Sequence, residues 1–266
     1  MAIQNSYGYD RTIGIAGGAA DNGTDIYVKD LPLAEAAKSG AAAVFSADRS
    51  KWRLPQANQL VIALDANLVG SNSFDGGITR SSLAGVASSE DAVSVVYATS
   101  HNNTMDLIKA AFDAFDNVSA ELTDSANNRE ITLTISGDES VAVSTAFAVT
   151  LGAGQAGVTS SLESGDVIAC VLGHEDLEGN PDGDPVQYAQ YDVVAGRRRG
   201  RVFVEPDTAL AVGDSIFARF VAGGSGEERG SIRNAADSVA TAFSGAVVDR
   251  ACSADEIGII EFDLIN

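Results

Sequence analysis

Short apolar runs separated by turn residues make up most of this chain, and two of them alternate with a period of two. Residues 118–123 and 130–135 place apolar and polar side chains in turn, which is typical of half-buried strands. The polar loop at 124–128 lies between them, so the two segments are predicted to form an antiparallel hairpin. Further strands are expected at 60–64, 67–69, 93–97 and 141–151, with Gly76 and Gly77 breaking the pattern.

One segment has the periodicity of an amphipathic helix. Residues 103–115 carry apolar side chains at i, i+3 and i+4 spacing, with charged residues on the other side. Asn103 or Thr104 is expected to cap the N-terminus, because a side-chain oxygen there can accept from a free backbone N–H. The positions expected to face a core are Leu107, Ile108, Ala111, Phe112 and Phe115.

The character of the pattern changes near residues 58 and 158. Residues 58–158 indicate a β-α-β-β unit with an extra strand, a small α+β domain with its own core. The flanking segments, 1–57 and 159–266, contain short strands at the spacing of a sandwich or barrel. The predicted fold is therefore mainly β: a sandwich-like or barrel-like body formed by both ends of the chain, with an inserted α+β domain.

Composition and charge narrow the class of protein. The chain has 266 residues, of which 45% are hydrophobic, so it can fold around a substantial core. A net charge of −20 repels phosphate and argues against nucleic acid as a partner. No apolar run of about eighteen residues predicts a membrane span, and residues 1–10 lack the basic and apolar regions of a secretory leader.

The sequence offers little catalytic chemistry. The two histidines, His101 and His174, lie in different predicted domains, and the motifs of serine hydrolases, P-loop enzymes and zinc proteases are missing. We therefore expect neither an enzyme nor a cofactor. Cys170 and Cys252 each have apolar neighbours, which favours buried free thiols, although the sequence leaves a disulfide between them open.

The loop at 174–184 is dense in oxygen-bearing side chains. Its spacing is similar to the opening of a calcium loop, but Ala189 stands where an EF-hand needs a bidentate glutamate. A solvated acidic turn is the favoured interpretation, and no metal is predicted. If a cation did bind, its ligands would be Asp176, Glu178, Asn180, Asp182 and Asp184.

The chain has one basic cluster, and it is short. It consists of Arg197, Arg198, Arg199 and Arg201, without the interleaved aromatic residues of a nucleic-acid motif. Two interpretations stay open. The arginines could pair with acidic residues of a neighbouring protein, or Arg201 could leave the strand and pair with a carboxylate of the same chain.

Four blocks near the C-terminus resemble the structural cement, or decoration, proteins of tailed bacteriophages. They read GRVFVE at 200–205, AVGDSIFARF at 211–220, GSIRNAADS at 230–238 and IGIIEFDL at 257–264. Together with a polar, tyrosine-containing start and the strand at 166–173, the resemblance covers 1–57 and 166–266. The middle of the chain is similar, more loosely, to small α/β modules inserted in phage structural proteins.

The resemblance implies a virion protein on the outer surface of the capsid. It would act as a homotrimer that staples adjacent subunits of the major capsid protein, with no nucleic acid or membrane as partner. Residues 11–20 form a small-residue arm that could add a strand to a neighbour. The interface candidates are Ile13 and Ile15 in this arm, the four arginines of the basic cluster, and Arg233.

Alternative functions follow from the same residues. One is another virion role, such as a head fibre or a tail-associated protein. The other is a carbohydrate-binding module that uses exposed aromatic side chains and calcium at 174–184. The inserted segment 58–165 holds 3 basic and 13 acidic side chains, and this acidic excess suits a module that projects into solvent.

Overall fold

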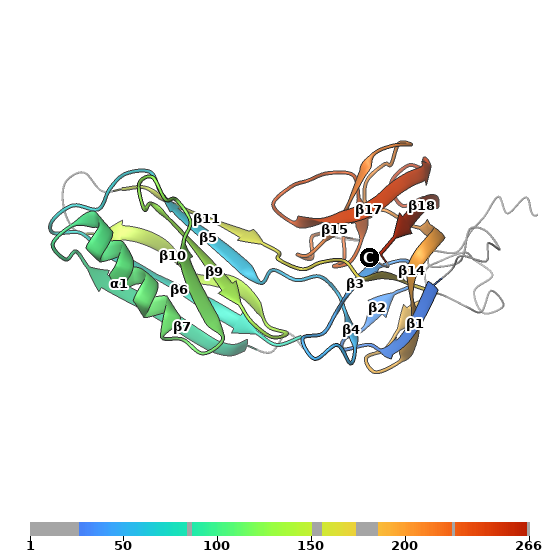
Figure 1. Ribbon diagram of the computed structural model, residues 1–266, viewed down its shortest axis with the longest axis horizontal. Coiled ribbons are helices and arrows are strands. Elements are labelled where there is room, and N and C mark those ends of the chain that lie inside the picture. Colours follow the sequence, from blue (N-terminus) through green and yellow to red (C-terminus); the bar gives the residue numbers. More distant parts are fainter. Residues whose placement is uncertain (1–26, 84–86, 151–155, 174–185, 225–226, 265–266) are drawn as a thin grey trace, which may run out of the picture.

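The computed structural model describes residues 27–83, 87–150, 156–173, 186–224 and 227–264. Figure 1 shows two lobes arranged along the long axis of the molecule. The body contains the first four and the last seven strands, and the inserted lobe contains everything between them. Strands dominate both lobes, so the predicted mainly-β fold with one small helix is confirmed.

The body is built on one long, curled sheet with the strand order β16-β15-β17-β18-β14-β12-β3-β4, and β1 also pairs with β14. A separate two-stranded sheet joins β2 to β13. The strands of the body are β1 (Tyr27–Pro32), β2 (Ala37–Lys38), β3 (Ala42–Phe45), β4 (Trp52–Arg53), β12 (Cys170–Leu172), β13 (Gln187–Tyr188), β14 (Val193–Val204), β15 (Ser215–Arg219), β16 (Ile232–Arg233), β17 (Ala240–Arg250) and β18 (Gly258–Asp263).

The inserted lobe has two antiparallel sheets, with the orders β10-β6-β7 and β11-β5-β9-β8, and its helix contacts β7 and β8. Its elements are β5 (Gln59–Leu64), β6 (Ser73–Ser81), β7 (Ala87–Val96), α1 (His101–Asp113), β8 (Val118–Leu122), β9 (Glu130–Ile135), β10 (Ser140–Thr150) and β11 (Val158–Glu163). Since β11 pairs with β5 along its whole length, the chain leaves this lobe after Glu163.

The helix begins at His101, earlier than predicted. Ser100 caps it in an extended conformation, and its Oγ accepts a hydrogen bond from the Asn103 N–H at 3.2 Å. The cap makes His101 the first helical residue, and its Nδ1 accepts from the Leu68 N–H at 3.0 Å, which ties the helix to the loop after β5. Leu107, expected in the core, is 49% exposed.

Two strand predictions in this lobe were wrong. Residues 67–69 form no strand, because the Leu68 N–H is used by His101 rather than by a neighbouring strand. Gly76 and Gly77 do not break the pattern, since both lie within β6 and pair with β7. A Cβ at Gly76 would collide with the ring of Phe147, so this glycine lets the aromatic ring cross the strand.

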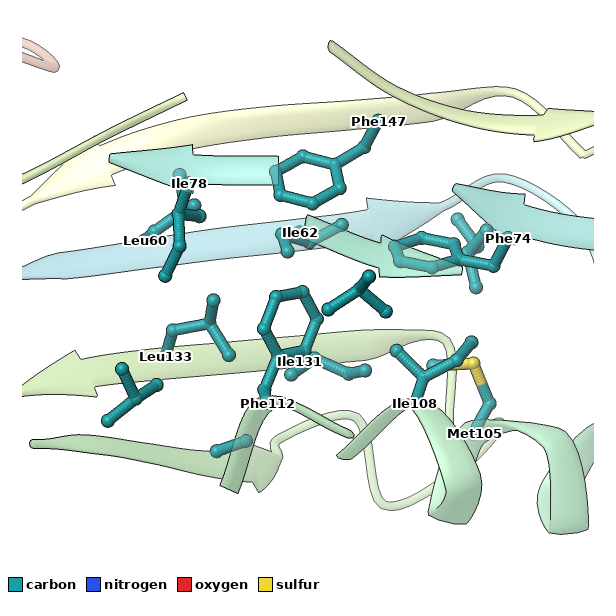
Figure 2. Packing of buried hydrophobic residues seen from close by; sticks show 14 of the residues in the cluster. Leu60, Ile62, Phe74, Ile78, Met105, Ile108, Phe112, Ile131, Leu133 and Phe147 are labelled. Atoms are coloured by element: carbon teal, nitrogen blue, oxygen red, sulfur yellow. The ribbon is translucent and has the colours of Figure 1, made fainter. Parts of the chain in front are cut away.

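Each lobe has its own apolar core. In the inserted lobe, Met105, Ile108 and Phe112 project from α1 onto side chains of the two sheets, as Figure 2 shows. The core residues on the strands include Leu60, Ile62, Phe74, Ile78, Ile131, Leu133 and Phe147. The body has two clusters, one around β14 to β18 and one around Trp52 and Leu172.

Buried polar contacts hold the two lobes together. Arg53 of β4 donates two hydrogen bonds of 2.7 Å to the carboxylate of Asp166, which lies on the return segment between the lobes. It also contacts Asp138, from the β9–β10 loop, at 3.0 Å. Asp166 accepts further bonds from the Gln56 N–H and the Asn58 amide. Both connecting segments are therefore fixed to the inserted lobe and to the body.

Gly196 in β14 allows the close packing of the second body cluster. An added Cβ would lie 2.5 Å from Trp52 Cε2 and 2.8 Å from Cys170 Sγ. We expect Gly196→Ala to lower the free energy of unfolding by about 1–3 kcal/mol, because overpacking forces these side chains to move. Denaturant titration measures the loss. Gly70→Ala is the matched control, since a Cβ there meets no atom within 4 Å, and an equal loss in both variants would contradict the packing argument.

Candidate functional site

The basic cluster lies on β14, the strand that links the halves of the body sheet. β14 pairs with β1 over its first half, with β18 over its second half, and with β12 in between. Neighbouring strands therefore cover both edges at Arg197, whose side chain is buried at 8% exposure. Exposure rises along the cluster, since Arg198 is half-buried and Arg199 is exposed.

The arginines of this cluster have partners within the chain. Arg198 donates to the carbonyl oxygens of Ala169 at 3.2 Å and Leu264 at 2.8 Å. Arg199 contacts Asp263 at 3.3 Å, in an ion pair whose side chains are about half exposed. Arg201 pairs with Asp249 of β17, so the interpretation in which it binds a carboxylate of its own chain is confirmed. An interface role for this cluster stays a prediction.

Arg233 belongs to a buried ionic network in the body. The carboxylate of Asp207, 4% exposed, lies 2.8 Å from Arg219 and 3.7 Å from Arg233. Arg219 also pairs with Glu227, and Arg233 with Asp237. Arg233 is thus directed into its own chain, where it holds the segments around β15 and β16 together. The sequence did not single out Asp207 and Arg219, although both stand in or beside the block at 211–220.

Several predicted candidates lie outside the described residues. They are Ile13 and Ile15 of the arm, His174, and the acidic loop residues Asp176, Glu178, Asn180, Asp182 and Asp184. Within the described ranges, no three His, Cys, Asp or Glu side chains are arranged to hold a metal ion. Of the helices that the structure describes, none has the length and apolar character needed to span a membrane.

The remaining chemical candidates have structural roles. His101 is buried, with Nδ1 on the Leu68 N–H and Nε2 near the carbonyl oxygens of Asn127 and Asn128. Both cysteines are free thiols, and Cys252 is half-buried rather than buried. Burial raises the pKa of the Cys170 thiol well above its usual value, which keeps it protonated and unreactive.

β1 is one of several edge strands among the described strands. Among the described strands, β1 pairs with β14 alone, so its other edge presents backbone N–H and C=O groups that no described strand uses. An edge of this kind can accept an extended segment by strand addition. The uncovered edge of β1 and the exposed arginines of β14 therefore form the candidate binding surface of this mainly-β protein.

Comparison with known protein families identifies the class of this structural protein. Residues 116–263 match the family described as "Structural cement protein (E217 gp24/Pam3 gp6)", and the chain belongs to this family. The match extends from the residues before β8 to the end of β18. The protein is therefore a structural protein of the phage virion. It stabilises the capsid and binds capsid subunits. No curated protein matches the chain.

Proposed function

We propose that this cement protein binds the outer face of the assembled shell and joins adjacent coat subunits, with the chain acting as a homotrimer. The observation that carries the proposal is the family match, which includes the whole second half of the body sheet. A protein that binds the expanded shell and not its precursor stabilises the expanded state by linkage. In a trimer, the weak contacts of the three copies would act together and hold the protein firmly on the shell.

The open edge of β1 and the arm before it are the proposed means of attachment. The edge lies where the N-terminal segment enters the body, and Ile13 and Ile15 would supply apolar contacts when an arm adds to a neighbouring strand. The inserted lobe is proposed to project away from the shell, since its acidic excess favours solvent. The arginines of β14 that remain exposed, Arg199 above all, would lie at the rim of the interface.

The test of this function uses expanded heads that lack the protein. Adding the purified chain is expected to raise the melting temperature of the heads, and electron microscopy is expected to show three-fold density on the outer surface. Density on the tail, or as a fibre away from the shell, would favour the alternative virion roles. The absence of binding to expanded heads would overturn the proposal.

Deletion of residues 1–20 is expected to weaken attachment without unfolding the body. The body keeps its described pairings, because β1 begins only at Tyr27. Occupancy on expanded heads should fall by about tenfold or more as the arm contact is lost, while the circular dichroism spectrum in the far ultraviolet keeps its strand signal. Unchanged occupancy would show that the arm does not bind the shell.

A further inference from the structure

Three basic side chains near Phe45 and Tyr191 form no ion pair with the described residues. Within the described ranges, no carboxylate lies at ion-pair distance from Lys29, Arg49 or Lys51. Other basic residues of the same ranges do form ion pairs, namely Lys38, Arg53, Arg80, Lys109, Arg199, Arg201, Arg219, Arg229 and Arg233.

Lys29 and Arg49 converge with Arg198 around one aromatic ring. Lys29 Nζ lies 4.7 Å from the centre of the Phe45 ring, Arg49 Cζ lies 5.3 Å from it, and Arg198 Cζ lies 5.7 Å from it. The three come from β1, from the turn after β3 and from β14, which are separate in sequence. The curl of the body sheet thus brings three positive charges to one side chain.

The ring is fixed, and its surroundings include exposed apolar surface. Phe45 packs on the fully buried Trp52, with ring centroids 4.6 Å apart. Beside it, Lys51 Nζ lies 5.2 Å from the Tyr191 ring, which is 63% exposed. We name Lys29, Phe45, Arg49, Lys51, Tyr191 and Arg198 the Phe45 face.

Four cations lie on the Phe45 face, and three of them, Lys29, Arg49 and Lys51, form no ion pair with a carboxylate of the described ranges. Each cation gains from the negative face of an aromatic ring, but the cations repel one another. Asp48 stands in the same turn, yet its oxygens accept hydrogen bonds from Ser46 and Ser50, which lower its pKa to about 2. Asp48 is therefore fully ionised, and the charge of Lys51 also helps to lower its pKa, so this one carboxylate offsets part of the positive charge. An external anion would relieve the repulsion that remains among the other cations.

We propose that the Phe45 face binds an acidic segment of the coat subunit, a step that rests on the proposed function. Carboxylates would meet the cations, while the exposed ring of Tyr191 would provide apolar contact of the kind that interfaces need. Nucleic acid is a poor occupant, because the net charge of −20 repels a polyphosphate while still permitting contact with a short acidic stretch. The face also adjoins β1, whose open edge is available for strand addition.

The test compares two triple variants of the full-length chain on expanded heads that lack it. The first variant reverses the charge of three cations of the Phe45 face: Lys29→Glu/Arg49→Glu/Lys51→Glu. The second variant makes the same change in net charge at three cations elsewhere: Lys109→Glu/Arg129→Glu/Arg250→Glu. We expect the first variant to bind about 100-fold more weakly, and the second to stay within about threefold of the wild type. Melting curves of both variants confirm folding, and Lys29→Gln/Lys51→Gln provides a milder second variant that should also lose affinity.

A second readout identifies the partner. Carbodiimide cross-linking of wild-type protein on expanded heads should join Lys29 or Lys51 to an Asp or Glu of the coat subunit. Equal losses in both triple variants, or cross-links only to a second copy of this chain, would overturn the assignment while the proposed function survives. If the wild type fails to bind expanded heads at all, the proposed function fails first and this inference with it.

Discussion

Arg53→Met is expected to lower the free energy of unfolding by about 3–5 kcal/mol, the usual effect of breaking a buried ion pair on one side. The Arg53 and Asp166 side chains are only 6% and 5% exposed. Burial alone would lower the pKa of Arg53, but the hydrogen bonds and charges of Asp166 and Asp138 outweigh it and hold the pKa above its usual value. Removing the guanidinium leaves the Asp166 carboxylate buried with its charge uncompensated.

Denaturant titration measures this effect, and Lys109→Met is its control. Lys109 and Asp113 form an ion pair on the helix surface with side chains 38% and 34% exposed, so its loss should cost about 0.5 kcal/mol. Hydrogen exchange adds a local readout at the Val141 N–H, which donates to the Ala57 carbonyl across the junction of the lobes. A loss below about 1 kcal/mol with unchanged exchange at Val141 would contradict a clamp at the junction.

Local patterns predicted the inserted lobe well. The hairpin expected at 118–123 and 130–135 is β8 and β9, paired from Val118 with Ile135 to Leu122 with Ile131. The alternation of apolar and polar residues and the loop between the two strands determine the pairing of such a hairpin, so the rest of the chain is not needed to predict it. The helix was also predicted, but its start was placed too late, because Asn103 or Thr104 was taken as the cap although Ser100, also a preferred capping residue, caps it.

The candidate site could not be derived from sequence in the same way. Arg197 and Arg198 are consecutive on β14, so their side chains point to opposite faces of the sheet, but only the tertiary packing shows that one face buries Arg197 and the other places Arg198 over Phe45. Arg53 and Asp166 are separated by 113 residues, and nothing local marks that aspartate among many others. The two-residue strands β2, β4, β13 and β16 are too short to carry a period. Lys29 and Arg49 were missed for the same reason, since only tertiary packing brings them to Phe45.

Phe112→Ala is expected to lower the stability of the inserted lobe by about 3–5 kcal/mol through the cavity that it leaves. Phe112 is fully buried on α1 and contacts Phe147 and Phe115 edge to face, with centroids 6.1 and 6.2 Å apart. Leu107→Ala on the same helix is the control, because that side chain is 49% exposed and its loss should cost about 0.5 kcal/mol. Denaturant titrations of both variants give the difference.

We propose that the inserted lobe is a folding unit of its own. Hydrogen exchange in the Phe112→Ala variant tests this, because it shows which lobe loses protection. The core around Phe112 contains only residues of the inserted lobe, so exchange should accelerate at its strands, such as Leu133, and not at Val202 in the body. If the amides of both lobes lose protection equally, the chain unfolds as one unit and the proposal is wrong. If Val202 stays protected, binding of the Phe112→Ala variant to expanded heads shows which lobe contacts the shell. Retained binding then places the shell contacts on the body, whereas lost binding assigns some of them to the lobe that Phe112 supports.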